Sequence, residues 1–340
     1  MKRYLLYIGQ NYSYQILRPL QQQIRARGHQ AAWFLEGSEV SPSYLKADEQ
    51  QLASIDAVRH YNPDVVLVPG PMVPSFIPGL KVEVFHGFDA GKPGHFEIRD
   101  CFDLYCTQGP STTRPFQQLA AKKSFSRVIE TGWPALDTLF TVPECHVPDQ
   151  RPTILLCSTF SRRYTCAPHL LETVATLRED DRWQWLVQFH PKMDAEVVQA
   201  YQALQNDNLT FIETDNIIPL LHQADLMVCD NSSVLLMFLL LNKPVVTFRN
   251  TQPGPHLLNI EQPEQLQAAI SQGLTRPAEL MEQIRLFNQQ LHPYTDGASS
   301  QRVLDAIDEV LAGKYPVQHK KPLNLRRNFK ARRKLNYWKL

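Results

Sequence analysis

The chain has 340 residues, of which 43% are hydrophobic and 20% are charged, and its formal net charge is +1. This composition is typical of a soluble globular protein, and the length suits two domains better than one core. The longest apolar run, residues 234–241, is too short to span a bilayer, and the apolar run near the N-terminus is too short for a signal peptide. We therefore expect a cytoplasmic protein.

The near-zero net charge conceals an uneven distribution along the chain. Residues 314–340 contain ten Lys or Arg and no Asp or Glu, which leaves 25 basic and 34 acidic side chains in the other 313 residues. A mildly acidic body thus carries a strongly basic tail, and such a tail predicts an anionic partner.

The first 145 residues alternate strand-like and helix-like segments. Apolar runs predict strands at residues 4–9, 31–35, 64–69, 82–85, 104–107 and 127–131, and periodic segments predict helices at 14–27, 48–61 and 111–121. This alternation predicts a doubly wound parallel sheet.

A second alternation follows residues 141–152, which carry three prolines and little periodicity. It predicts strands at 153–159, 184–189, 209–212, 226–229 and 245–248, with helices at 167–178, 194–205, 264–274, 277–290 and 299–312 and two shorter ones on either side of 226–229. We therefore predict an α/β fold of two Rossmann-like domains that face each other across a cleft. Their predicted bounds are 1–145 and 146–313, followed by the basic tail 314–340.

Polar residues follow several predicted strands at their carboxyl ends, where parallel sheets bind ligands. His86 follows a strand of the first domain, whereas Thr159, His190 and the turn DNSS at 230–233 follow strands of the second. The two serines of that turn precede a helix and suit a phosphate, with helix capping as the alternative. The histidines suit proton transfer, with a structural role as the alternative.

The segment 292–307 contains a further candidate for anion binding. Asp296 and Gly297 belong to a predicted turn, and Arg302 lies in the first turn of the helix that follows. The planar donor fork of a guanidinium suits a diphosphate, and a solvated helix face is the alternative.

Motifs of several nucleotide and metal enzymes are missing from the sequence. It contains no G-x-x-x-x-G-K-[ST], no G-x-G-x-x-G, no H-E-x-x-H and no Cys/His cluster with zinc spacing. We predict no metal site and no required cofactor, and a divalent cation stays open. The cysteines form no C-x-x-C pair and are expected to be reduced and buried: Cys101, Cys106, Cys145, Cys157, Cys166 and Cys229.

Five motifs occur along residues 80–310 in a fixed order: FHG at 85–87, TGWPALD at 131–137, FHP at 189–191, LLHQADLMVCDNSSVLLMFLLLNKPVVTF at 220–248, and DGASSQRV at 296–303. In kind and order they resemble the motifs of the CDP-glycerol glycerophosphotransferases, the family of teichoic acid primases and polymerases. Three places depart from the family pattern. Phe88 stands for a Thr, Asn231 stands for a Tyr, and CSTFS at 157–161 stands for Ala-Pro-Thr-Trp-Arg, with the arginine displaced to Arg162 and Arg163. The alditol or sugar on the nucleotide therefore stays open.

The resemblance implies a GT-B fold and transfer of glycerol phosphate from CDP-glycerol, or a similar CDP-alditol, to a hydroxyl with release of CMP. It implies that His86 is the general base for the acceptor hydroxyl. The residues implied to hold the donor diphosphate are His190, Ser232, Ser233 and Arg302, with further donor contacts from Thr159, Asp230, Asp296 and Gly297.

The tail interleaves basic residues with Leu, Phe, Tyr and Trp over residues 320–340. Basic and aromatic side chains favour an anionic membrane surface, so we predict peripheral attachment to the inner face of the cell membrane, where a lipid-linked glycan acceptor would lie. Binding to nucleic acid is an alternative that we do not expect. A disordered tail that only increases solubility is the other alternative.

Two other functions remain open from the sequence. Residues 292–307 also resemble a segment of the non-hydrolysing UDP-N-acetylglucosamine 2-epimerases, although the Gly-Thr-Arg-Pro-Glu that opens those enzymes is replaced by GQNYS at 9–13. A membrane-surface binding protein that keeps the fold without turnover is the non-enzymatic alternative.

Overall fold

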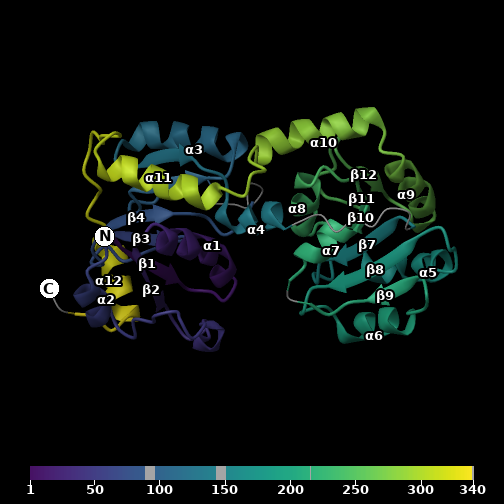
Figure 1. Cartoon of the computed structure of the whole chain (residues 1–340), viewed down its shortest axis with the longest axis horizontal. Helices are drawn as coiled ribbons and strands as arrows, with labels where there is room; N and C mark the ends of the chain where they lie inside the picture. The colour runs from purple at the N-terminus through teal and green to yellow at the C-terminus, as the bar shows by residue number, and fades with distance from the viewer. Residues whose placement is uncertain (89–95, 143–150, 215, 339–340) are drawn as a thin grey trace. The chain divides into compact units, whose positions relative to one another are not determined.

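The computed structural model describes residues 1–88, 96–142, 151–214 and 216–338, and it divides into two compact units. Unit 1 comprises Met1–Thr141 and Gln290–Leu340, and unit 2 comprises Val142–Gln289. In each unit the described strands form one six-stranded sheet, flanked by helices (Figure 1). All pairings between these strands are parallel, as the alternating sequence pattern predicts.

Unit 1 has the strand order β2-β1-β3-β4-β5-β6, which reverses direction between β1 and β3. Doubly wound folds bind ligands at the carboxyl ends of the strands beside such a switch point. The strands are β1 (Arg3–Ile8), β2 (Gln30–Leu35), β3 (Val65–Val68), β4 (Leu80–Glu83), β5 (Leu104–Thr107) and β6 (Arg127–Glu130). The helices are α1 (Ser13–Ala26), η1 (Pro42–Tyr44), α2 (Ile55–Tyr61), α3 (Pro110–Lys123), η2 (Pro134–Leu136), α4 (Asp137–Thr141), α11 (Ser299–Leu311) and α12 (Leu325–Lys334).

Side chains of the unit 1 strands alternate between two hydrophobic cores. In β1, Tyr4 and Leu6 face the core that α1 and α11 cover, whereas Leu5 and Tyr7 face the core that α2 and α3 cover. All four side chains are at most 2% exposed. Burial on both faces explains why this strand is an unbroken apolar run in the sequence.

Unit 2 has the strand order β12-β11-β10-β7-β8-β9, with its switch point between β7 and β10. This is the strand order of the Rossmann fold. The strands are β7 (Thr153–Ser158), β8 (Gln184–Phe189), β9 (Leu209–Phe211), β10 (Leu226–Cys229), β11 (Val245–Phe248) and β12 (Leu258–Ile260). The helices are α5 (Ala167–Leu177), α6 (Ala195–Ala203), α7 (Ile218–Gln223), α8 (Val234–Leu240), η3 (Pro263–Gln265), α9 (Leu266–Leu274) and α10 (Ala278–Leu291).

The C-terminal bound of the second domain differs from the prediction. The sequence pattern assigned residues 290–313 to the second domain, whereas the structure places them in unit 1. Helix α11 buries Val303, Ile307 and Val310 in the core that lies between the sheet and α1. Because this apolar stripe completes that core, the helix belongs to unit 1.

The basic tail packs on unit 1 instead of extending away from it. Tyr337 is only 6% exposed, and its ring lies 5.2 Å from the ring of Phe76. Lys321 pairs with Asp103 at 2.6 Å, and further ion pairs join Arg327 to Asp100 and Lys334 to Glu36. The tail composition predicts an anionic partner, and carboxylates of unit 1 therefore pair with some of its basic residues.

The five cysteines in the described residues are buried and free, as expected. Burial raises the pKa of each of their thiols. The sixth, Cys145, lies outside the described residues.

Candidate active site

His86 lies at the carboxyl edge of unit 1, three residues after β4. Its Nδ1 lies 3.3 Å from the carbonyl oxygen of Pro69, which directly follows β3. Its ring lies 6.0 Å from the ring of Tyr12, which follows β1. Since β1 and β3 flank the switch point, the exposed His86 side chain lies where this kind of sheet binds ligands.

The contact with Pro69 determines the tautomer of His86. A carbonyl oxygen only accepts hydrogen bonds, so Nδ1 carries the proton and the lone pair of the neutral ring lies on Nε2. This is the form of imidazole that takes a proton from a hydroxyl. The neutral His86 ring thus has the tautomer that the predicted role as a general base requires.

The residue before His86 adopts a backbone conformation that bulky side chains rarely adopt. Phe85 has a φ of 58°, in the left-handed region, which costs about 1–3 kcal/mol. Packing maintains this conformation, because the Phe85 ring is 3% exposed and lies edge-on to Phe116. The Phe85 carbonyl also accepts a 3.2 Å hydrogen bond from Nε1 of Trp133. The strained turn keeps Phe85 in the core and leaves His86 at the surface.

At the switch point of unit 2, a buried carboxylate joins the ends of β7 and β10. Asp230 is fully buried and accepts hydrogen bonds from the Ser158 hydroxyl at 2.6 Å, the Thr159 amide at 3.1 Å and the Cys166 amide at 2.9 Å. The family resemblance implied that Asp230 contacts the donor. Its carboxylate instead holds the loop after β7, which gives Asp230 a positioning role.

The two serines after Asp230 were expected either to bind a phosphate or to cap a helix. Ser233 is the N-cap residue of α8 but makes no side-chain cap hydrogen bond, and the Val234 amide lies 3.4 Å from the Ser232 hydroxyl. Capping is therefore weak, and both hydroxyls can donate to an anion. Because α8 has only seven residues, its dipole adds little to that recognition.

Hydrogen bonds from the loop after β11 hold the serine turn from the other side. The side-chain oxygen of Asn231 accepts from the Thr251 amide at 2.9 Å and from the Thr251 hydroxyl at 2.7 Å. The Asn250 side chain donates to the carbonyl of Asp230 at 2.9 Å. Asn231, one of the departures from the family pattern, thus has a structural part in keeping the turn rigid.

His190 follows β8, the strand beside β7, and has the opposite tautomer to His86. The Lys192 amide donates to Nδ1 at 3.0 Å, so the neutral ring carries its proton on Nε2. Desolvation and the charge of Lys192 lower the pKa of His190, which favours the neutral form of the ring. The ring of Phe160 lies 4.6 Å away. In the neutral rings, Nε2 of His190 is therefore a hydrogen-bond donor, whereas Nε2 of His86 is an acceptor.

Arg302 belongs to unit 1, whereas His190 and the two serines belong to unit 2. Its Nη1 and Nη2 donate to the two carboxylate oxygens of Asp296 at 2.8 and 2.9 Å, and its Nε donates to the Thr131 carbonyl at 2.9 Å. These hydrogen bonds lower the pKa of Asp296 to about 2. Arg302 thus belongs to unit 1, at the exit of β6, whereas His190 and the two serines belong to unit 2.

The TGWPALD and DGASSQRV motifs form one junction in unit 1. The Asp137 carboxylate accepts 2.8 Å hydrogen bonds from the amides of Ser299 and Ser300, the first residues of α11. Gly297 has a φ of 65°, and a Cβ there would lie 2.5 Å from the Thr141 side chain. Gly297, expected to contact the donor, is therefore a turn residue at the place where α11 meets α4.

No pattern in the sequence indicated the role of His292. This residue is 1% exposed, and its Nε2 accepts a 2.9 Å hydrogen bond from the amide of Trp133. Desolvation lowers the pKa of His292 to about 4. His292 thus supports the loop that carries Trp133 and is neutral at pH 7.

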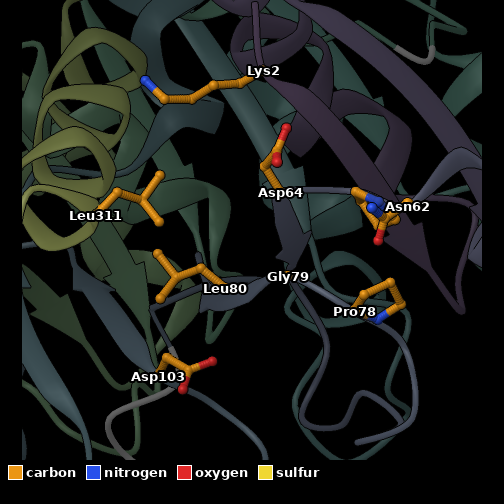
Figure 2. Close-up of a pocket in the computed structure, with 9 residues that line it drawn as sticks. Lys2, Asn62, Asp64, Pro78, Gly79, Leu80, Asp103 and Leu311 are labelled. Atoms are coloured by element: carbon orange, nitrogen blue, oxygen red, sulfur yellow. The ribbon is translucent and has the colours of Figure 1, made fainter.

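A hollow of about 530 Å³ opens at the other, amino-terminal edge of the unit 1 sheet (Figure 2). Two of its charged lining residues already have partners, since Lys2 pairs with Asp308 at 2.8 Å and Asp103 pairs with Lys321. We assign it no ligand, because parallel sheets bind ligands at their carboxyl edge. Within the described ranges, no group of three His, Cys, Asp or Glu residues is placed to hold a metal ion.

The sequence profile of one family matches the chain over residues 97–253, and that family is described as CDP-Glycerol:Poly(glycerophosphate) glycerophosphotransferase. Over this range the chain is similar to the CDP-glycerol glycerophosphotransferases. The matched range confirms the resemblance drawn from the sequence motifs. It contains Thr159, His190 and the serine turn, whereas His86 and Arg302 lie outside it.

Solved structures of two kinds of enzyme share the fold of this chain. The wall teichoic acid polymerase TagF, in a variant soaked with CDPG, is 14% identical, with a TM-score of 0.63 over 92% of this chain and 90% of that chain. A Listeria monocytogenes protein described as a UDP-N-acetylglucosamine 2-epimerase is 16% identical, with a TM-score of 0.66 over 92% and 97%. The UDP-GlcNAc 2-epimerase from Neisseria meningitidis, bound to UDP-GlcNAc, is 15% identical, with a TM-score of 0.62 over 90% and 100%.

These similarities confirm the predicted GT-B type of α/β fold with two Rossmann-like units. At such low identity they establish the fold alone, and it is common to both classes of enzyme. No curated protein matches the sequence.

Proposed function

We propose that the protein transfers glycerol phosphate, or a related alditol phosphate, from a CDP-linked donor to a hydroxyl of a lipid-linked or surface-polysaccharide acceptor. The observation that carries the proposal is the opposite tautomers of two strand-exit histidines. Nε2 of His86 holds a lone pair, and Nε2 of His190 holds a proton. One is suited to accept a proton and the other to donate a hydrogen bond, which transfer of a phosphoryl group between oxygens requires.

In the proposed reaction, the acceptor oxygen attacks the phosphorus that bears the alditol. A bond forms between the acceptor oxygen and this phosphorus, the bond from phosphorus to the bridging oxygen breaks, and CMP leaves with the bridging oxygen. Nε2 of His86 takes the proton of the acceptor hydroxyl. Since phosphoryl transfer depends mainly on positioning and charge stabilisation, the donors around the diphosphate supply the remaining catalysis.

The donor diphosphate is assigned to the carboxyl edge of unit 2. The hydroxyls of Ser232 and Ser233 and Nε2 of His190 supply neutral donors there, and Thr159 flanks the same switch point. Arg302 belongs to unit 1 and is a separate candidate for anion binding there. Three of the five N–H groups of its guanidinium donate the hydrogen bonds described above. The other two can donate to a phosphate oxygen.

The test measures CMP release from CDP-glycerol and CDP-ribitol with a lipid-linked glycan as acceptor. We expect CMP only when donor and acceptor are both present, and not with His86→Ala. Binding of CDP-glycerol should persist in His86→Ala and weaken in Ser233→Ala. If neither CDP-alditol yields CMP or raises the melting temperature, the proposal is wrong.

An epimerase is the second candidate, because segment 292–307 resembles that family and solved epimerases share the fold. Incubation with UDP-N-acetylglucosamine distinguishes the two. Conversion to the C2 epimer, without any CMP release from CDP-alditols, would replace our proposal with this one.

Helix α12 and its flanks supply the proposed contact with the inner face of the cell membrane. Leu323, Leu325, Phe329 and Trp338 are 86%, 74%, 57% and 53% exposed, and they alternate with basic residues such as Lys330. This composition suits an anionic lipid surface. None of the described helices has both the length and the apolar composition to cross a bilayer.

Co-sedimentation with vesicles tests this attachment. We expect binding to vesicles that contain phosphatidylglycerol, weaker binding to pure phosphatidylcholine, and loss of binding in Phe329→Ser. Equal binding of Phe329→Ser and the unchanged protein would rule out this surface. Tighter binding to duplex DNA than to anionic vesicles would favour the nucleic acid alternative.

A further inference from the structure

Three aromatic side chains lie at strand exits around the proposed base in unit 1. Tyr12 follows β1, Phe88 follows β4, and Trp133 follows β6. The Tyr12 ring lies 6.0 Å from the His86 ring, and Phe88 lies two residues beyond His86. The aromatic groups therefore flank His86 along the carboxyl edge of a single unit.

These rings are held in place without being fully buried. Trp133 is half-buried, its Nε1 donates to the Phe85 carbonyl, and its amide donates to His292. Phe88 is also half-buried and lies edge-on to Trp133, with ring centroids 5.2 Å apart. Tyr12 is 48% exposed. Each ring therefore keeps apolar surface that a ligand can cover.

The chemistry of the reactants indicates which ligand covers the exposed surface of the three rings. Glycerol phosphate has no ring and little apolar surface, so an aromatic rim adds little to its binding. A pyranose ring has an apolar face of C–H groups, which packs on aromatic rings while its hydroxyls stay free to hydrogen-bond. A sugar that lies on this rim would present a hydroxyl to Nε2 of His86.

The cytosine of the donor is the competing occupant of an aromatic surface. Unit 2 has its own exposed rings next to the proposed diphosphate site, because Phe160 and Tyr164 follow β7 and are 44% and 38% exposed. Phe160 also packs against His190. Cytosine therefore has a platform within the unit assigned to the diphosphate, and the unit 1 rim remains for the acceptor.

We infer that Tyr12, Phe88 and Trp133 form an acceptor subsite that binds a sugar ring, so that the reacting hydroxyl belongs to a pyranose rather than to a chain of glycerol phosphate units. This inference rests on the proposed transferase function in assigning His86 as the base. It identifies Phe88, which replaces a Thr of the family pattern, as a specificity-determining residue.

Kinetics of ring-deletion variants test the subsite. Tyr12→Leu and Phe88→Leu keep an apolar side chain but remove the ring, and each should raise KM for a glycan acceptor about tenfold while KM for CDP-glycerol stays unchanged. Tyr44→Leu is the matched control, because Tyr44 is 54% exposed but packs on Tyr14 instead. If Tyr12→Leu and Phe88→Leu raise KM for CDP-glycerol instead, cytosine occupies the rim and the inference is wrong.

A binding experiment that does not depend on turnover separates this inference from the proposed function. In a Trp338→Phe background, Trp133 is the half-exposed tryptophan, since Trp33, Trp183 and Trp185 are at most 4% exposed. Titration with methyl N-acetyl-β-glucosaminide should change the indole fluorescence with saturation, and oligo(glycerol phosphate) should not. The change should disappear in Trp133→Phe.

The outcomes distinguish the two ideas. A saturable response to the glucosaminide without CMP release from any CDP-alditol leaves the subsite standing and rejects the transferase. CMP release that uses oligo(glycerol phosphate) as efficiently as the glycan, with Phe88→Leu unchanged, leaves the transferase standing and rejects the subsite.

Discussion

At the scale of single residues, a hydrogen bond to Nδ1 sets the neutral tautomer of each strand-exit histidine. The Pro69 carbonyl makes Nε2 of His86 an acceptor, and the Lys192 amide makes Nε2 of His190 a donor. Both bonds come from backbone groups, so side-chain substitutions at Pro69 or Lys192 do not remove them directly. Variants of the histidines themselves are therefore the informative ones.

We predict that His86→Gln lowers kcat by about 10²–10⁴-fold and leaves the affinity for CDP-glycerol unchanged, because glutamine keeps the polarity but cannot take up the proton. His190→Gln should instead weaken donor binding. Steady-state kinetics with calorimetric titration of CDP-glycerol measure both. The assignment of a base fails if His86→Gln retains the full kcat.

A second prediction concerns the buried carboxylate of Asp230. Asp230→Ala leaves the Ser158 hydroxyl and two amides without their acceptor, so the free energy of unfolding should fall by about 3 kcal/mol and donor affinity should fall with it. Asp225→Ala is the control, since Asp225 accepts one 2.8 Å bond from the Thr153 amide at the amino edge. That variant should lose about 1 kcal/mol without any change in donor affinity, as urea denaturation and calorimetry will reveal.

At the scale of secondary-structure elements, the return of α11 to unit 1 determines where Arg302 lies. The Asp137 carboxylate receives the first two amides of α11, and the apolar side of the helix fills the core beside α1. His292 supports the same region from the chain segment that precedes α11. Stability of this junction therefore bears on the predicted anion-binding residue.

The junction predicts a loss of stability at mildly acidic pH. The pKa of His292 falls from 6.5 to about 4 on folding, so between these values the unfolded chain binds more protons and the free energy of unfolding falls as pH falls. At pH 5 the loss from this group is about 2 kcal/mol relative to pH 7. His292→Gln keeps an acceptor for the Trp133 amide and should remove this part of the pH dependence.

Urea denaturation of both proteins at pH 7 and pH 5 checks the sign and the size. The exposed His319, changed to Gln, serves as the control and should leave the pH dependence intact. An identical pH dependence in His292→Gln and the unchanged protein would contradict the assignment.

Most strands could be predicted from the sequence, and the reasons for the failures are local. Strands β5, β8, β10 and β11 have their predicted bounds, because a polar residue directly follows each of them and ends the apolar run. Helix α2 begins at Ile55 instead of residue 48, since the Ser54 hydroxyl caps it there. β12 has only three residues, and α12 carries too many basic residues to show an apolar period. The apolar pattern of α11 also does not indicate which of the two sheets this helix packs against.

The candidate site could be predicted in part. Strand exits indicated His86, His190 and the serine turn, because parallel sheets present these positions at one edge. The tautomers could not be predicted, since backbone contacts set them. The burial of Asp230 and the support from His292 likewise depend on contacts between residues far apart in the sequence.

At the scale of the whole molecule, the sequence profile of the family spans parts of both units, and the tail extends beyond it. The tail nevertheless belongs to the folded body of unit 1. Its ion pairs to Asp103 and Glu36 and the burial of Tyr337 attach it there, while the apolar side chains of α12 stay exposed. The same segment therefore packs on unit 1 and carries the exposed surface on which the membrane proposal rests.

Two adjacent tail residues distinguish the packing of the tail from the proposed membrane contact. Tyr337 is 6% exposed, and its hydroxyl accepts a 3.0 Å hydrogen bond from Arg59, so Tyr337→Ala should lower the free energy of unfolding by about 3–5 kcal/mol. Trp338 is 53% exposed, so Trp338→Ala should leave stability within about 0.5 kcal/mol and weaken binding to phosphatidylglycerol vesicles. Thermal denaturation and vesicle co-sedimentation on both variants measure the two effects. Equal loss of stability in both variants would show that the tail serves the fold alone, because the exposed ring would then be part of the packed core.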